Sequence, residues 1–199
     1  MKKIITVGRE FGSGGRELGR RLAEALGVAY YDKEIIVEIA KRTELSEQYV
    51  NNIVENKPLV SYPIHVGVSF NTGNFAPVQQ KNNIYYEQEQ ILKEMAEKAP
   101  CVIVGRCADH ILREFDPFRI FVYSDLETKM RRCRSKGIGE EEISDKDLKK
   151  YIQRVDKNRA EYYEFYTGKK WGEKLNYDLC INTTGTDIKM IVSVLAKML

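Results

Sequence analysis

The feature that most constrains the fold is a glycine-rich loop between an apolar strand and an amphipathic helix. Residues 3–7 are apolar and β-branched, which predicts a buried strand. Residues 18–26 repeat leucine and alanine at helical spacing, and Gly27 favours a helix end. The connection is Gly8-Arg9-Glu10-Phe11-Gly12-Ser13-Gly14-Gly15-Arg16-Glu17. Glycines let backbone N–H groups turn inward and a helix N-terminus adds partial positive charge, so this segment predicts a phosphate cradle.

The loop departs from both standard nucleotide-binding patterns. In G-x-x-x-x-G-K-S/T, the lysine position is Gly15 if Gly14 is the last glycine, and Arg16 if Gly15 is. Neither register supplies a lysine followed by a hydroxyl. In the dinucleotide pattern G-x-G-x-x-G, Glu17 takes the last glycine position. A tight turn without a ligand is the alternative, but four glycines and a serine exceed what such a turn needs. The loop predicts phosphate without specifying the ligand.

Composition excludes several classes of protein. The chain has 199 residues, 43% hydrophobic and 31% charged, which is typical of a globular protein. A net charge of +3 is too small to indicate nucleic acid or a membrane surface, and the apolar runs are too short for a membrane span. The N-terminus lacks a signal-peptide pattern, so a cytoplasmic location is expected. The four cysteines lack C-x-x-C spacing, which disfavours zinc and disulfides, and no protein metal ligands are predicted.

Strand and helix patterns alternate along the rest of the chain. Further strands are predicted at residues 28–31, 101–104, 119–123 and 176–182. Helices are predicted at residues 33–42, 46–55, 84–98, 126–136 and 144–163, and at the C-terminus. This order favours an α/β fold, a parallel sheet of about five strands with helices on both faces. Residues 56–83 read as an irregular flap, in which His65 has no recognisable partner.

Charged residues follow the predicted strands. Asp32 ends the second strand, where open α/β sheets bind ligands, although it could instead cap the next helix. Arg106 follows the buried strand at 101–104, and Asp109 lies three positions on; a surface salt bridge is the alternative for Arg106. The helix at 126–136 is strongly basic and precedes a glycine-containing, acidic segment. A basic helix followed by such a segment is typical of a lid that closes over phosphates; the alternative is a charged helix face exposed to solvent.

Four segments together resemble the cytidylate kinase-like proteins of bacteria, and behind them the cytidylate kinases of the P-loop nucleoside monophosphate kinase superfamily. They are Ile5-Thr6-Val7-Gly8-Arg9-Glu10-Phe11-Gly12-Ser13-Gly14-Gly15-Arg16-Glu17, Tyr30-Tyr31-Asp32-Lys33-Glu34, Val102-Ile103-Val104-Gly105-Arg106-Cys107-Ala108-Asp109 and Asp156-Lys157-Asn158-Arg159. The resemblance spans nearly the whole chain and is weakest at 56–83. It implies a three-layer P-loop NTPase-type domain over residues 1–199, with an acceptor-binding insertion at 43–90 and an arginine-rich lid at 126–167.

The resemblance also implies roles for individual residues. The donor phosphates would contact Gly12, Ser13, Gly14, Gly15, Arg16, Glu17 and Arg132. The acceptor would contact Asp32, Arg106, Asp109, Asp156 and Arg159. Transition-state charge would come from Arg16, Arg106 and Arg131. ATP and Mg²⁺ are the expected cofactors, a small-molecule nucleotide the partner, and the protein a monomer or homodimer without nucleic acid. The loop lysine and its hydroxyl are missing, and Cys107 replaces the aspartate of the family's G-R-D segment, for which Asp109 is a candidate substitute.

Three functional hypotheses follow. The first is ATP-dependent phosphoryl transfer to a nucleoside monophosphate, with CMP or dCMP the best acceptor. The second is a regulatory protein that binds a nucleotide without turnover, which the missing lysine favours and the retained arginines oppose. The third is a dinucleotide-dependent oxidoreductase, suggested by Gly12, Gly14 and Asp32 but disfavoured by Glu17 and the basic lid.

Overall fold

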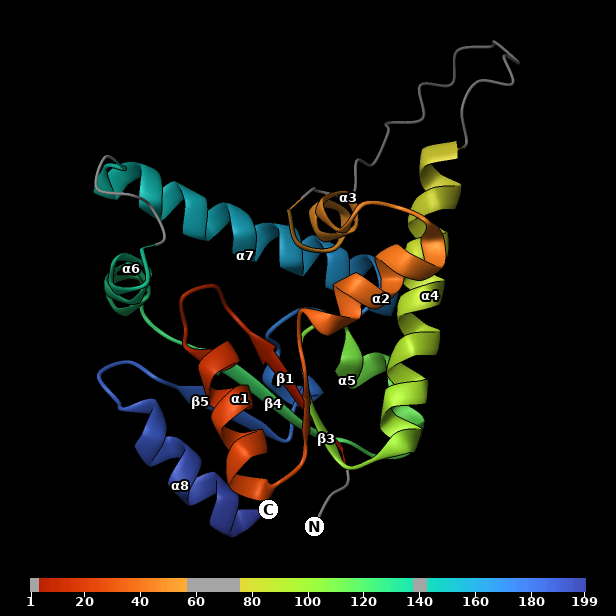
Figure 1. Cartoon of the computed structure of the whole chain (residues 1–199). Helices are drawn as coiled ribbons and strands as arrows, with labels where there is room; N and C mark the ends of the chain where they lie inside the picture. The colour runs from red at the N-terminus through yellow and green to blue at the C-terminus, as the bar shows by residue number, and fades with distance from the viewer. Residues whose placement is uncertain (1–3, 57–75, 138–142) are drawn as a thin grey trace.

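A parallel sheet of five strands forms the centre of the molecule (Figure 1). The structure, a computed structural model, describes residues 4–56, 76–137 and 143–199. The strands lie in the order β2-β3-β1-β4-β5 and all pair in parallel. They are β1 (Ile4–Arg9), β2 (Ala29–Tyr31), β3 (Cys101–Val104), β4 (Phe118–Tyr123) and β5 (Leu179–Asn182). Because every strand runs the same way, their carboxyl ends meet at one edge, where an open α/β sheet binds its ligands.

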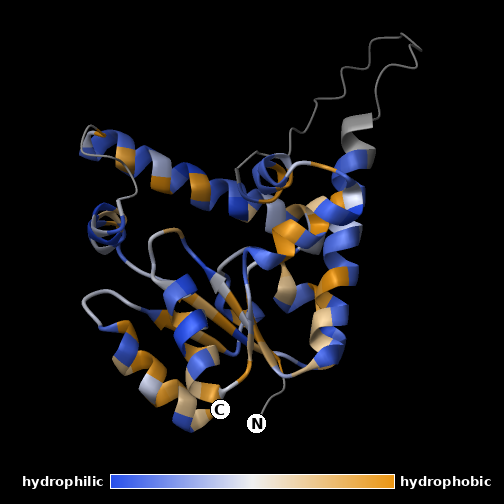
Figure 2. Cartoon of the chain, viewed as in Figure 1, coloured by the Kyte–Doolittle hydropathy of each residue, from blue (hydrophilic) through white to orange (hydrophobic). Residues whose placement is uncertain are grey.

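Alternating side chains of the strands build one core on each face of the sheet. Ile5 and Val7 of β1 pack with α1 (Gly15–Leu26) and α8 (Ile188–Met198). Ile4 of β1 points the other way and joins α2 (Glu34–Thr43), α4 (Ala76–Lys98) and α5 (Ala108–Ile111). Figure 2 shows the apolar residues gathered on the strands and on the helix faces turned toward them. This arrangement confirms the predicted three-layer α/β fold.

The remaining elements lie above the carboxyl edge of the sheet or connect its layers. α3 (Glu47–Asn51) runs into a π-helical turn, η1 (Asn52–Asn56). α6 (Leu126–Ser135) and the long α7 (Asp145–Thr167) cross above the sheet (Figure 1). Two short 3₁₀ turns, η2 (Arg113–Phe115) and η3 (Lys174–Asn176), complete the chain. α6 and α7 share a small core of Cys133, Leu148 and Ile152, which also covers Phe11 of the glycine loop.

Most predicted elements are confirmed, with shifts at their ends. Ser46 and Ser144 cap α3 and α7 as helix patterns predict, each accepting a hydrogen bond from a backbone N–H three residues on. α4 begins at Ala76, eight residues earlier than predicted, inside the stretch read as irregular. Pro77 lies in the first turn of α4, where no intrahelical bond requires its missing N–H.

Part of the predicted irregular flap, with His65, and the acidic run of residues 140–142 lie outside the described residues. The four cysteines are free, as their spacing predicts. None of the described helices combines the length and the apolar character needed to cross a bilayer.

Candidate active site

The glycine loop joins β1 to α1 at the carboxyl edge of the sheet. Gly12 and Gly14 adopt left-handed backbone conformations, with φ of 75° and 86°. The N–H and hydroxyl groups of the buried Ser13 both donate to the carbonyl of Glu10, which closes the turn. Gly14 is the residue before the first turn of α1, and no side chain caps that turn. The helix N-terminus therefore presents unsatisfied N–H groups and positive dipole charge, which fit a phosphate.

Helix α6 packs directly on this loop. A Cβ on Gly12 would lie 3.0 Å from the carbonyl oxygen of Lys129, so the loop needs glycine there. Arg132 Nη1 donates to the Ser13 carbonyl at 2.8 Å and to Thr183 Oγ1 at 2.8 Å, and Nη2 donates to the Thr183 carbonyl at 3.0 Å. Arg132 thus fastens α6 both to the loop and to the segment between β5 and α8.

A second link to the loop is an ion cluster of Lys129, Glu10 and Asp156. Lys129 Nζ lies 2.7 Å from Glu10 Oε2 and 2.9 Å from Asp156 Oδ2. Burial acts to lower the pKa of Lys129, but hydrogen bonds to the two carboxylates raise it above its ordinary value. The other oxygen of Asp156 accepts from the N–H of Phe11 at 2.6 Å. Asp156, expected at the acceptor, thus holds the loop and the basic helix α6 together in this structure.

Arg16 does not extend along the loop. Its Nε lies 2.5 Å and its Nη2 3.3 Å from the carboxylate of Asp32, which is 3% exposed. Glu17, the next residue, binds Arg21 on the next turn of α1. Asp32 likewise does not cap α2, whose N-terminal cap position is Lys33. The Arg16–Asp32 pair links the start of α1 to the end of β2.

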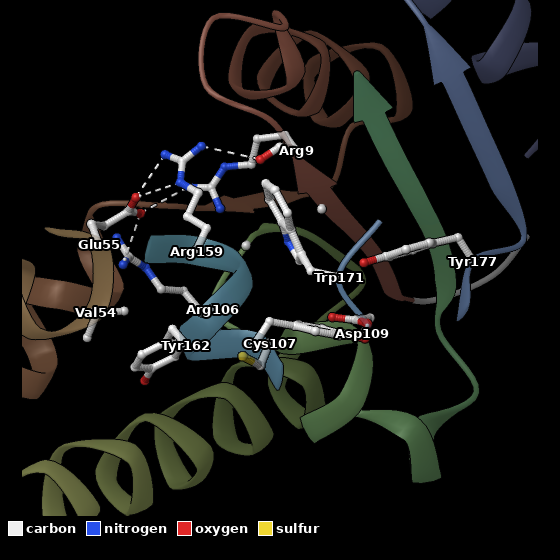
Figure 3. Close-up of a pocket in the computed structure, with 13 residues that line it drawn as sticks. Arg9, Val54, Glu55, Arg106, Cys107, Asp109, Arg159, Tyr162, Trp171 and Tyr177 are labelled. Atoms are coloured by element: carbon white, nitrogen blue, oxygen red, sulfur yellow. Dashed lines mark hydrogen bonds and ion pairs between the residues drawn. The ribbon is translucent and has the colours of Figure 1, made fainter. Parts of the chain in front are cut away.

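Three arginines, of which Arg9 and Arg106 are buried and Arg159 is partly buried, converge on one carboxylate, that of Glu55 in η1 (Figure 3). Arg9 Nη2 and Arg106 Nη1 each lie 3.1 Å from Glu55 Oε1, and Arg159 Nη2 donates to Oε2 at 2.8 Å. Burial acts to raise the pKa of Glu55, but the three cations hold it well below its ordinary value. The arginines come from β1, from the β3–α5 turn and from α7. We call these four residues the arginine cluster.

An unusual turn holds Arg106 in the cluster. Gly105, Arg106 and Cys107 are all left-handed, with φ of 77°, 61° and 52°. This conformation is strained for arginine and cysteine, and such strain concentrates at functional sites. Gln88 of α4 secures the turn by donating to the Arg106 carbonyl at 2.9 Å. Arg106 Nε is buried and has no hydrogen-bond partner among the described residues.

The arginine cluster forms one end of a pocket beneath α7, and Asp109 lies toward the other (Figure 3). Tyr163 donates its hydroxyl hydrogen to Asp109 Oδ2 at 2.6 Å. Burial raises the pKa of Asp109 above its ordinary value. Trp171 and Tyr177 line the same pocket. This cavity therefore has a cationic end and an aromatic end.

The expected site residues fall into distinct groups. Arg106 and Arg159 share the arginine cluster, and Asp109 lines its pocket. Arg16 and Asp32 pair beside the loop, and Arg132 and Asp156 brace it. Arg131 lies exposed on α6, with Nη2 3.4 Å from Thr128 Oγ1.

Arg9, Glu55 and Lys129 were not among the predicted site residues. Arg9 ends strand β1 at the start of the glycine loop, and that position was the available signal. Lys129 lies in the basic helix predicted at residues 126–136, but neither Lys129 nor Glu55 could be matched to its partners, because those are distant in the sequence.

Comparison with known proteins gives a family and a set of similar folds. A model of the cytidylate kinase-like family matches residues 4–185. A crystal structure of an uncharacterized protein from Eubacterium ventriosum has 28% sequence identity and a TM-score of 0.70, and the match covers 98% of this chain and 96% of that one.

Two shikimate kinase structures, each 16% identical, have a similar fold. The one from Bacteroides thetaiotaomicron has a TM-score of 0.58 and covers 98% of this chain and 97% of its own. The one from Acinetobacter baumannii, in complex with shikimate, has a TM-score of 0.53 and covers 98% and 90%. A search of curated protein sequences found no significant match.

Proposed function

The chain belongs to the cytidylate kinase-like family, and from this premise we propose that it transfers the γ-phosphoryl group of ATP to a nucleoside monophosphate, with CMP or dCMP the best acceptor. The observation that carries the proposal is the arginine cluster. Its three guanidiniums share one carboxylate, so the four described side chains carry a net charge of +2 in a largely buried site. A phosphate monoester dianion matches that charge, whereas a carboxylate monoanion matches half of it.

The position of the cluster supports the same function. Arg9 and Arg159 line both the pocket over the glycine loop and the pocket that holds Arg106 and Asp109. A donor phosphate on the loop and an acceptor phosphate at Arg106 would therefore meet at these two arginines. Phosphoryl transfer needs such positioning and positive charge more than covalent help from the protein.

The described residues fit ATP better than they fit a resident Mg²⁺ ion. The open N-terminus of α1 suits the phosphates. Glu10, Asp32, Glu55 and Asp156 are each already bound to a cation. We therefore expect Mg²⁺ to arrive with the nucleotide, held by its phosphates and by water, and assign it no protein ligand.

The other two hypotheses make different demands on the fold. The strand order β2-β3-β1-β4-β5 differs from the 3-2-1-4-5 order of the dinucleotide-binding fold, which argues against an oxidoreductase. A nucleotide-binding regulator without turnover is favoured by Gly15 at a lysine position and by the engagement of Arg16 with Asp32.

Two measurements test the proposal. In thermal unfolding, ATP with Mg²⁺ at about a hundred times its Kd should add roughly 2.7 kcal/mol of stability, and NAD should add none. A coupled ADP-release assay should then show acceptor-dependent turnover with CMP or dCMP above that with UMP, AMP or shikimate. If the protein binds ATP but releases no ADP with any nucleoside monophosphate, the regulator hypothesis would be favoured. Stabilisation by NAD alone would favour the oxidoreductase hypothesis.

A further inference from the structure

The start of α1 selects one register of the phosphate-loop pattern. Gly14 is the left-handed residue before the helix, and the helix begins at Gly15. With Gly14 as the last glycine, the pattern G-x-x-x-x-G-K covers residues 9–15. Arg9 then stands at the first glycine position, and Gly15 at the lysine position. Relative to the standard pattern, the basic residue and the glycine have exchanged places.

The two exchanged residues depend on each other sterically. A Cβ on Gly15 would overlap Cβ of Arg9 and would lie 3.2 Å from Cβ of Val122. A lysine at position 15 would therefore require Arg9 or the backbone that carries it to shift. Gly105 makes room for the far end of the same side chain, since a Cβ there would overlap the Arg9 guanidinium. Gly15 and Gly105 thus leave the space that the Arg9 side chain occupies.

The Arg9 side chain passes these two glycines, and its guanidinium lies at the boundary between the pocket over the glycine loop and the pocket of the arginine cluster. The residue is 7% exposed and lines both the loop pocket and the pocket of the arginine cluster (Figure 3). Its Nη2 lies 3.1 Å from Glu55, and Arg159 donates to its carbonyl at 3.3 Å. Burial, and then the nearby charge of Arg159, lower the pKa of Arg9 to about 10, so it stays charged at neutral pH. Its only anionic partner in the cluster is a carboxylate that it shares with two other cations.

We propose that Arg9 is the relocated cation of the phosphate loop, and that its guanidinium contacts the γ-phosphoryl group in place of the missing lysine. This inference rests on the proposed function. An oxygen of the acceptor phosphate bonds to the γ-phosphorus, and the bond from that phosphorus to the β–γ bridging oxygen breaks. ADP leaves with the electron pair, and a nucleoside diphosphate forms. Arg9 keeps its proton throughout and stabilises charge on the transferring group.

The first test reads the contact with the γ-phosphate without requiring turnover. The Kd values of ATP and ADP are measured by calorimetry for the wild type, Arg9→Met and a control, Arg119→Met, which changes an arginine near the opposite end of β4. We expect Arg9→Met to lose about tenfold of the preference for ATP over ADP, and the control to keep it. Arg9→Lys retains the charge but loses the planar guanidinium fork, so its preference for ATP over ADP should lie between those of the wild type and Arg9→Met. This variant replaces Arg9→Met in the test if Arg9→Met does not fold.

The second test restores the standard arrangement. Gly15→Lys alone should lower the melting temperature, because the new side chain collides with Arg9. Arg9→Gly alone should lower kcat about a hundred- to a thousandfold. The double variant Arg9→Gly/Gly15→Lys should recover at least tenfold of that loss and regain the melting temperature lost by Gly15→Lys.

Three results would overturn the inference. They are an unchanged ATP-to-ADP preference in folded Arg9→Met or Arg9→Lys, a loss of that preference in Arg16→Ala instead, and a stable Gly15→Lys single variant. A wild type that binds ATP yet phosphorylates no nucleoside monophosphate would remove the proposed function, while the Kd ratio would still decide the role of Arg9.

Discussion

Lys129 and Asp156 form a largely buried ion pair, with 2.9 Å between Nζ and Oδ2, that joins α6 to α7 above the glycine loop. Their side chains are 10% and 15% exposed. In Lys129→Met, Glu10 and Asp156 would face each other without the cation between them. We expect a loss of about 3 kcal/mol in the free energy of unfolding, measured by urea denaturation. Lys157→Met, which removes an exposed pair with Glu161 on α7, should cost less than about 1 kcal/mol. Equal stability of the two variants would contradict a stabilising role for the Lys129–Asp156 ion pair.

Arg106 is predicted to bind the acceptor rather than ATP. Arg106→Lys keeps the charge and the left-handed backbone but removes the planar fork. Two lost charge-assisted hydrogen bonds of about 1.5 kcal/mol each correspond to roughly a hundredfold fall in kcat/KM for the acceptor. Initial-rate kinetics should show that fall while the Kd of ATP, from calorimetry, changes less than threefold. Unaltered acceptor kinetics would remove Arg106 from the site.

Arg131 and Arg132 are neighbours on α6, but replacing Arg132 should lower stability, whereas replacing Arg131 should lower kcat. Arg132→Ala leaves the buried Ser13 carbonyl and Thr183 hydroxyl without this donor, which should cost about 1–3 kcal/mol of stability in the absence of nucleotide. Arg131→Ala, an exposed change, should leave the melting temperature within about 1 °C and lower kcat. Differential scanning fluorimetry and the coupled assay separate the two effects. The reverse pattern would show that Arg132 acts on the nucleotide and Arg131 on the fold.

Asp109 should make stability depend on pH. Burial raises the pKa of Asp109 in the folded state, so the folded state binds a proton more tightly than the unfolded state does. The free energy of unfolding therefore falls as pH rises through the folded-state pKa of Asp109. Asp109→Asn retains an acceptor for the Tyr163 hydroxyl but carries no charge. The variant should therefore melt above the wild type at pH 8, and the difference should shrink toward zero at pH 4. A difference that is constant between pH 4 and pH 8 would contradict this explanation.

The sequence was sufficient for the fold because its signals were local. Buried strands such as residues 101–104 and caps such as Ser144 follow from periodicity and from short-range hydrogen bonding. The start of α4 was wrong because a proline in the first turn looks like a proline that ends a helix. Boundaries of this kind depend on the backbone conformation rather than on residue type.

The site was less predictable because its residues are distant in the sequence. Arg106 could be named from its position after a buried strand, and Arg159 from the resemblance to the cytidylate kinase-like family. Their shared partner Glu55 could not, since it is 104 residues from Arg159 in the chain and lies in a π-helical turn that no pattern indicates. Arg16 stands at the lysine position in one register of the loop pattern and was expected to supply transition-state charge. Its guanidinium lies instead on Asp32, which only the packing of β2 beside β3 brings within reach.

A ³¹P NMR time course of the wild-type protein with ATP, Mg²⁺ and CMP or dCMP tests whether phosphate is transferred to a nucleoside monophosphate. This spectrum distinguishes a new nucleoside diphosphate from inorganic phosphate released by hydrolysis. Resonances of CDP or dCDP should grow at the rate at which ATP disappears, and should grow about a hundredfold more slowly with Arg106→Lys at subsaturating acceptor. Conversion of ATP to ADP and inorganic phosphate alone would contradict transfer to a nucleoside monophosphate. An unchanged spectrum from a protein that binds ATP would contradict it as well.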